Sequence, residues 1–321
     1  MASRYLISVD LGGTKILSAL IDSRNKIVSK VKIPTETEKG GKYLVESVAA
    51  SVRQILNENN LKERDIKAVC MGVPGTVNPY SGEIGTAPNL GIKNFNIKKE
   101  LGEKISIPVL IENDVNLAGL GIKKFELNAD KKNILVVFIG TGIGGALFFD
   151  GKLYRGSSFF AGEIGHMLVE PKGELAASSK RHTFELTASR TAIVRNIRRG
   201  LKKGRKSILK EFQSPTTLLK SKTISEAVLK EDPLAIKYVG KAAKAIGTVL
   251  GSITTLLNVD TIVLGGGVIE AMHGFMIPKI KTAFKESVLE EPGKNVNIFA
   301  TKLGDNAALY GGIALAEEFL K

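Results

Sequence analysis

Asp10 and two glycine-rich turns carry the residue types of this chain that are best suited to binding phosphate. The first turn, Gly12-Gly13-Thr14-Lys15, follows Asp10 almost directly, and the second is Gly140-Thr141-Gly142. Glycine leaves backbone N–H groups open to an anion, and the threonine hydroxyl adds a donor. An aspartate beside a triphosphate could hold Mg²⁺ directly or through water, although it could equally form the turn itself. Two phosphate-binding turns, with a metal-binding aspartate at the first, are therefore predicted.

Asp114 has two possible roles, as a general base or as a helix cap. It lies in Glu112-Asn113-Asp114, between an expected strand at 107–111 and an expected helix at 115–125. Transfer of a phosphoryl group to an alcohol needs a carboxylate that accepts the hydroxyl proton. Asparagine and aspartate before a helix are also good N-caps. The local sequence by itself favours the cap.

The surroundings of the second turn exclude two common nucleotide sites. Gly140, Gly142 and Gly145 match the pattern G-x-G-x-x-G. A dinucleotide site of that pattern requires a helix directly afterwards, because the helix N-terminus holds the pyrophosphate. Here residues 146–149 have the apolar character of a strand, and no G-x-x-x-x-G-K-[ST] occurs in the chain. A hairpin of strand, glycine turn and strand remains.

The elements that must position these groups occur in the same order twice. Strand-like runs at 5–9, 16–21 and 27–33 surround the first turn, and runs at 134–139, 146–149 and 152–154 surround the second. Each set is followed by alternating helices and strands. The expected helices are 43–58, 115–125, 184–201, 234–257 and 306–320, and the further strands are 66–72, 107–111, 261–264 and 296–301. This order predicts an α/β chain of two lobes.

Length and composition are those of a globular protein with two cores. The chain has 321 residues, of which 43% are hydrophobic and 24% charged. No segment approaches the roughly 20 apolar residues that a membrane helix needs. The first strand begins close to the N-terminus, so we expect no signal peptide. Cys70 is the one cysteine and cannot form an internal disulfide, which suits a reducing, cytoplasmic location.

The net charge of +14 favours anionic partners such as nucleotides, phosphorylated sugars, polyphosphate or nucleic acid. A solvated lysine-rich surface is the simpler interpretation. The basic run at 195–210 has few aromatic residues that could stack on bases. The sequence therefore argues against nucleic acid as a partner.

A set of motifs in fixed order resembles the ROK family of bacterial sugar kinases and repressors, within the actin/hexokinase/sugar-kinase superfamily. The motifs are DLGGTK (10–15), APNL (87–90), ENDVN (112–116), GTGIGG (140–145), AGEIGH (161–166), GGG (265–267) and GDNAALYGG (304–312). The resemblance implies a two-lobed actin-like (ribonuclease H-like) fold, with mixed sheets flanked by helices and both substrates in the cleft between lobes. The implied small lobe is 1–115 with the returning helix 306–321, and the implied large lobe is 116–305.

The resemblance also implies a role for each candidate residue, and it favours Asp114 as general base over Asp114 as cap. The residues implied to contact ATP are Asp10, Gly12, Gly13, Thr14, Lys15, Gly140, Thr141, Gly142, Gly265, Gly266 and Gly267, with Mg²⁺ at Asp10. Those implied to contact the sugar are Asn89, Asn113, Asp114, Glu163, His166 and Glu185. Carboxylates and amides suit this task, because each can pair with two adjacent hydroxyls. Relatives of this kind are commonly homodimers, so a homodimer is expected.

The chain departs from the family at a structural zinc site. Many relatives bind zinc through the histidine of GEIGH and three cysteines. The cysteine positions hold Ala176, Ser178 and Thr183 here, and His166 with the neighbouring His182 cannot complete four ligands. Alanine offers no ligand, and neutral hydroxyls are poor zinc ligands compared with thiolate. We expect no zinc.

The function implied is ATP-dependent phosphorylation of a hexose, foremost glucose, at its 6-hydroxyl. Three alternatives remain: a polyphosphate-dependent hexose kinase, a kinase of another hexose or N-acetylhexosamine, and a non-catalytic sugar-sensing regulator. Regulators of the family carry a winged-helix segment ahead of the first phosphate motif. That motif begins at Asp10 here, so we expect no such segment.

Overall fold

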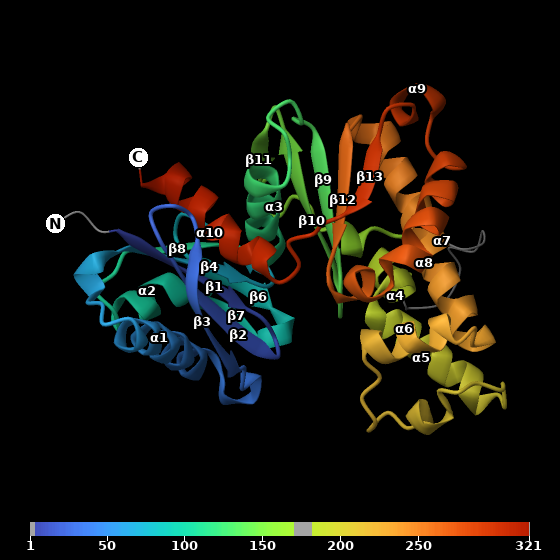
Figure 1. The fold of residues 1–321 in the computed structure, drawn as a ribbon, viewed down its shortest axis with the longest axis horizontal. Helices are drawn as coiled ribbons and strands as arrows, with labels where there is room; N and C mark the ends of the chain where they lie inside the picture. Colours follow the sequence, from blue (N-terminus) through green and yellow to red (C-terminus); the bar gives the residue numbers. More distant parts are fainter. Residues whose placement is uncertain (1–3, 170–181, 321) are drawn as a thin grey trace. The chain divides into compact units, whose positions relative to one another are not determined.

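The first sheet combines an antiparallel three-stranded meander with two parallel strands. The structure, a computed structural model, describes residues 4–169 and 182–320. The strands follow the order β3-β2-β1-β4-β8; β2 runs antiparallel to β1 and β3, whereas β4 and β8 run parallel to β1 (Figure 1). Their bounds are β1 Tyr5–Leu11, β2 Lys15–Ile21, β3 Ile27–Pro34, β4 Ile66–Val73 and β8 Val109–Asn113.

The second sheet has the same plan. Its order is β11-β10-β9-β12-β13, with β10 antiparallel to β9, and with β12 and β13 parallel to it. The bounds are β9 Ile134–Ile139, β10 Ile143–Phe149, β11 Lys152–Tyr154, β12 Thr261–Gly265 and β13 Asn297–Ala300. The two sheets thus agree with the repeat that the order of elements predicts, and each glycine turn joins the first two strands of its sheet.

Alternation along β2 explains why helices cover both faces of the first sheet. Ile16 and Leu20 belong to the core beneath helix α1 (Gly41–Glu58), where the Ser18 hydroxyl lies 2.8 Å from the Ser51 hydroxyl. Leu17 and Ala19 point to the other face and pack on Leu309 of helix α10 (Asn306–Phe319). Successive side chains of a strand point to opposite faces. Because residues 16–21 are mostly apolar, the sequence of β2 requires cover on both sides.

A small third sheet was not predicted. It has the order β5-β6-β7, and a short 3₁₀ turn at Pro88–Leu90 lies between β6 and β7. This turn carries Asn89, so the small sheet positions a candidate sugar-binding residue. The bounds are β5 Thr76–Val77, β6 Glu83–Ala87 and β7 Ile92–Asn96, followed by helix α2 Ile97–Gly102.

Two expectations about helices were wrong or incomplete. The helix expected at 184–201 is two helices, because Ser189 is extended and its hydroxyl accepts the Ala192 N–H at 3.2 Å, as an N-cap. Helix α8 was missed, since Gly274 and Pro278 interrupt its apolar pattern. The bounds are α4 Phe184–Ala188, α5 Arg190–Lys202, α6 Ser221–Leu229, α7 Pro233–Leu257, α8 Gly267–Lys285 and α9 Glu290–Gly293. The remaining 3₁₀ turns are Thr37–Lys39, Glu63–Asp65, Ile164–His166 and Lys210–Gln213.

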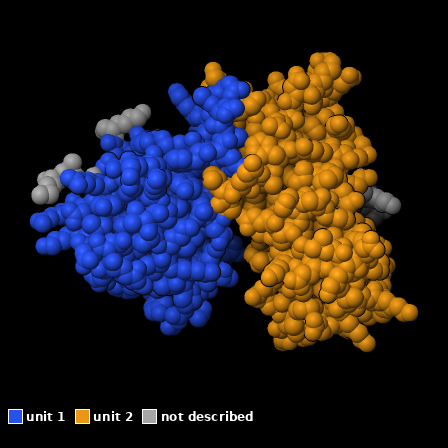
Figure 2. All heavy atoms as spheres, in the orientation of Figure 1, with its two compact units in different colours: residues 1–130, 151–161, 305–321 blue, residues 131–150, 162–304 orange. Residues whose placement is uncertain are grey.

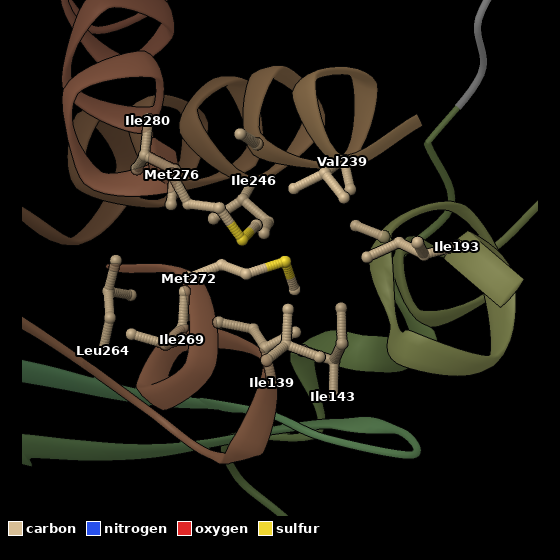
Figure 3. Packing of buried hydrophobic residues seen from close by; sticks show 14 of the residues in the cluster. Ile139, Ile143, Ile193, Val239, Ile246, Leu264, Ile269, Met272, Met276 and Ile280 are labelled. Atoms are coloured by element: carbon tan, nitrogen blue, oxygen red, sulfur yellow. The ribbon is translucent and has the colours of Figure 1, made fainter. Parts of the chain in front are cut away.

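The core over the second sheet lies between the sheet and helices α7 and α8. Figure 3 shows Met272 and Met276 of α8 meeting Ile246 of α7. Ile139 and Ile143, which flank the second glycine turn, lie in the same cluster. A fully apolar cluster at this place holds both ends of the turn-bearing hairpin against the helices.

The chain divides into two compact units, coloured separately in Figure 2. The first comprises residues 1–130, 151–161 and 305–321, and the second comprises 131–150 and 162–304. Helices α3 (Asp114–Phe125) and α10 pack on each other in the first unit. Among the described residues, no helix is long and apolar enough to cross a bilayer.

Candidate active site

In the first unit, the strands bring Asp10 and the end of β8 to one edge of the sheet. Asp10 of β1 lies in register with Gly72 of β4, and Gly72 lies in register with Glu112 of β8. These three strands are parallel, so their carboxyl ends meet at the same edge. Asp114 begins α3 directly after β8. The two aspartates proposed for chemistry are therefore neighbours in one unit.

The charges at this edge are strongly coupled. Burial, together with the negative charges of Asp114 and Asp305, raises the pKa of Asp10 to about 7, while Lys15 opposes the increase. Lys15 was expected to contact phosphate, and its ammonium forms an ion pair with Asp305 in the structure. Sequence reasoning did not single out Asp305, although it stands in the GDNAALYGG motif. An excess of negative charge at this edge suits a cation.

The first glycine turn is a tight hairpin beside Asn89. The Gly12 N–H donates to the Lys15 carbonyl at 3.0 Å, and the Thr35 hydroxyl donates to the Gly12 carbonyl at 2.7 Å. A Cβ on Gly13 would lie 3.0 Å from the backbone oxygen of Asn89. The structure thus brings a predicted phosphate turn and a predicted sugar residue together within the first unit.

The helix cap before α3 is Asn113. Its side-chain oxygen accepts the N–H groups of Val115 and Asn116 at 2.9 and 3.1 Å, and its amide donates to the Gly75 carbonyl at 3.1 Å. Asp114 is the first residue of the helix. The N-cap function that the local sequence favoured for Asp114 therefore belongs to the residue before it.

In the second unit, the glycine turn is in contact with Glu185. A carboxylate oxygen of Glu185 accepts the Ile143 N–H at 2.8 Å. A Cβ on Gly142 would lie only 2.3 Å from the same oxygen, so any other residue at this position would displace the Glu185 carboxylate. Glu185 was expected to contact sugar, and the structure connects it to the predicted phosphate turn.

Arg190 is a residue of this turn that sequence reasoning missed. Its guanidinium donates to the Thr141 hydroxyl at 2.5 Å, and its backbone N–H donates to the Gly140 carbonyl at 2.9 Å. The neighbouring Thr191 hydroxyl donates to the Thr141 carbonyl at 2.7 Å. No local pattern could have indicated this, because Arg190 lies about 50 positions further along the chain. It adds a positive charge where phosphate is expected.

Glu163 and His166 lie close to Glu185. His166 Nδ1 is 3.4 Å from a carboxylate oxygen of Glu163, and the His166 side chain is 74% exposed. Burial raises the pKa of Glu163 above its ordinary value; the Glu185 charge adds to this, whereas His166 opposes it. Three candidate sugar residues thus form one cluster in the second unit.

The triple glycine joins β12 to α8, with Gly265 as the last residue of the strand and Gly267 as the first residue of the helix. A Cβ on Gly265 would meet the Phe138 ring at 2.9 Å, and one on Gly266 would meet the Ile139 carbonyl at 2.7 Å. Both glycines are thus required by packing against β9. Gly267 is exposed, with open space beside it, and is the position where bare backbone remains accessible.

The segment that bears Glu185 is anchored by hydrogen bonds at Thr183. Thr183 pairs with Leu168 in an isolated β-bridge, and its hydroxyl accepts the Leu186 N–H at 3.3 Å as the cap of α4. Phe184 is fully buried in the core.

Thr183 is one of the three positions at which many relatives have a zinc-binding cysteine. The other two, Ala176 and Ser178, lie outside the described residues. Within 4–169 and 182–320 there is no group of three or more His, Cys, Asp or Glu side chains arranged to bind a metal.

The sequence model of the ROK family matches residues 6–319. The chain belongs to the ROK family. It is 31% identical over 313 residues to a glucokinase of Halalkalibacterium halodurans, covering 97% of this chain and 94% of that protein. It is 25% identical to the DNA-binding transcriptional dual regulator NagC of Escherichia coli, covering 98% of this chain and 75% of the regulator.

Solved structures agree with this assignment. The ROK family glucokinase of Streptomyces griseus, crystallised with glucose and AMPPNP, superposes with a TM-score of 0.83 at 27% identity, covering 98% of this chain and 99% of that one. The ROK hexokinase of Thermus thermophilus gives a TM-score of 0.76 at 27% identity, covering 98% and 99% of the two chains. The predicted family and the predicted actin-like α/β fold class are confirmed. The roles of individual residues stay predictions.

Proposed function

We propose that this protein phosphorylates a hexose, foremost glucose, at its 6-hydroxyl with ATP as donor. The observation that carries the proposal is the meeting of Asp10, Asp114 and the first glycine turn at one sheet edge. A general base beside a cation-binding carboxylate is what phosphoryl transfer to an alcohol requires. Similarity to glucokinases, one of them with bound glucose and AMPPNP, supports the substrates.

In the proposed mechanism, Asp114 accepts the proton of the sugar hydroxyl as that hydroxyl attacks the γ-phosphate. The two glycine turns bind the phosphates through the backbone N–H groups of Gly13, Thr14, Thr141 and Gly142, which holds the donor in line. The N–H groups of Gly12 and Gly140 donate to carbonyls of their own turns and keep the turns in shape. Glu163, His166 and Glu185, with Asn89 and Asn113, pair with the other hydroxyls. The triple glycine 265–267 accommodates the adenosine against the bare backbone that stays accessible at Gly267.

Asp10 is suited to hold Mg²⁺, with Asp114 and Asp305 adding negative charge nearby. Burial and, after it, the charges of Asp114 and Asp305 raise the pKa of Asp10 to about 7, and a divalent cation would stabilise the ionised carboxylate against both. Carboxylate oxygens are also the ligands that Mg²⁺ prefers. The bound ion would neutralise charge on the transferring phosphoryl group.

The test is a coupled assay of purified protein over a panel of hexoses and phosphoryl donors. We expect glucose with ATP and Mg²⁺ to give the highest kcat/KM, and Asp114→Asn to abolish turnover while leaving the melting temperature within a few degrees. An active Asp114→Asn protein would refute the assignment of the base. Substantial turnover with polyphosphate instead of ATP would favour the alternative donor that the net charge of +14 suggests.

A second candidate function is that of a sugar-responsive regulator without catalysis. The observation that favours it is the similarity to the regulator NagC over 98% of this chain. Binding of a sugar in calorimetry, together with no phosphorylation of any hexose in the panel, would support this candidate over the kinase.

A further inference from the structure

Glu112, two residues before the proposed base, is a buried carboxylate that the mechanism above does not use. Its side chain is 1% exposed. One oxygen accepts the Asn113 N–H at 3.0 Å and the Asn116 side-chain amide at 3.1 Å. Glu112 therefore binds both the backbone just before Asp114 and the first turn of the helix that Asp114 begins.

The other oxygen of Glu112 is bound by Arg155, from the segment 151–161 of the same unit. Arg155 Nε donates to it at 2.7 Å, and the two terminal nitrogens of Arg155 donate to both oxygens of Glu318 at 2.8 and 3.1 Å. The Arg155 side chain is only 10% exposed. The guanidinium fork thus joins the end of β8 to the last turn of α10.

Stability alone does not explain this arrangement. Removing two charges from water costs about as much as their attraction returns, so a buried ion pair stabilises little compared with an apolar pair. Such an ion pair instead fixes the positions of its members, because the planar guanidinium binds two carboxylates at defined distances and in defined directions. Here one of the two carboxylates belongs to Glu112, which immediately precedes the turn that carries Asp114.

We propose that Glu112 and Arg155 are positioning residues that hold the β8–α3 turn so that the Asp114 carboxylate meets the sugar hydroxyl. The inference rests on the proposed function, since it assigns the two residues to the same site. The proton of the hydroxyl still passes to Asp114, and neither Glu112 nor Arg155 touches a substrate. A displacement of the base by about 1 Å can lower a rate on the order of 100-fold.

Three variants separate positioning from mere stability. Glu112→Gln keeps an oxygen for Asn113 and Asn116 but turns an amide N–H₂ towards the Arg155 donor. Arg155→Lys keeps the charge but loses the fork. The double variant Glu112→Gln with Arg155→Met removes both charges, which should restore much of the stability that a single unpaired charge would cost.

The experiment measures kcat, both KM values and the melting temperature of each variant. We expect Glu112→Gln to lower kcat by about 10- to 100-fold with the KM for ATP within about twofold, and Arg155→Lys to keep an intermediate kcat. The double variant should regain thermal stability without regaining kcat. The control is Glu317→Gln on helix α10, next to Glu318. It breaks an exposed ion pair with Lys124 of α3 and should leave kcat unchanged.

The outcomes distinguish a wrong function from wrong positioning roles for Glu112 and Arg155. If the wild-type protein phosphorylates no sugar, both the function and the positioning inference are wrong. If the wild type is active and kcat is unchanged in Glu112→Gln and Arg155→Lys, only the positioning inference is wrong. Recovery of kcat together with stability in the double variant would show a purely structural pair and would also overturn it.

Discussion

Replacing Asp10 by asparagine should make the ligand-free protein more stable while abolishing its proposed activity. Asp10 is an acid held at a place that disfavours its ionised form, through burial and the charges of Asp114 and Asp305. Asparagine has nearly the same shape and no charge, so Asp10→Asn removes this electrostatic penalty with little change in packing. The same substitution removes the carboxylate proposed to hold Mg²⁺.

The pKa of Asp10 fixes the sign and the pH range of the effect. Below pH 4 the carboxyl is protonated in both the folded and unfolded states, so the substitution should change little. Between pH 4 and 7 the unfolded state ionises first, and the wild type loses stability as the pH rises. A change in the Asp10 pKa from 3.8 to about 7 corresponds to a loss of at most about 4 kcal/mol in the free energy of unfolding of the wild type at pH 8. Since residue 10 is partly accessible to solvent, which screens the charges, we expect Asp10→Asn to gain ~2 kcal/mol in the free energy of unfolding at pH 8.

The assay is urea denaturation of wild type and Asp10→Asn at pH 4, 6 and 8, without metal or nucleotide. The matched control is Asp22→Asn, because backbone N–H groups of Lys26 and Arg24, with the Arg24 side chain, lower the pKa of Asp22. That control should lose stability at pH 8, which is the opposite sign. If Asp10→Asn gains no stability at pH 8, or gains as much at pH 4, the electrostatic account of this edge is wrong. Mg²⁺ with AMPPNP should raise the melting temperature of the wild type and not of Asp10→Asn.

Four further predictions concern helix packing, phosphate binding, the cap of α4 and the expectation of no zinc. Gly311→Ala should cost about 3 kcal/mol in urea denaturation, because its Cβ would lie 1.8 Å from a carbonyl of α3, whereas Gly240→Ala, with open space in α7, should gain about 0.5 kcal/mol. Arg190→Ala should raise the KM for ATP about tenfold, and Lys202→Ala at the far end of α5 should leave it unchanged; equal KM values in both would contradict a phosphate role. Thr183→Ala should cost about 1 kcal/mol through loss of the α4 cap. A chelator should not change the wild-type melting temperature, and a chelator-sensitive protein with one zinc by elemental analysis would contradict the expectation of no zinc.

Much of the fold could be predicted because its signals are local. Strand β9 lies at the predicted residues, and β1, β4 and α3 differ from expectation by one or two residues. Helix α8 could not be predicted, since Gly274 and Pro278 interrupt its apolar pattern and the helix is stabilised by packing on α6, α7 and β13. The break at Ser189 depends on one capping hydrogen bond, which a continuous helical pattern conceals.

The sequence by itself determined the family, the strand–turn–strand hairpins and the candidate residues within them, because each motif is a short stretch whose residues are covalent neighbours. Tertiary structure decided which of those residues touch. Only the fold pairs Lys15 with Asp305, turns Glu185 towards Ile143, brings Arg190 to Thr141 and joins Glu112 to Arg155. The physical reason is distance along the chain: these contacts form between segments that the sheets and helices bring together, and no local spacing rule encodes them.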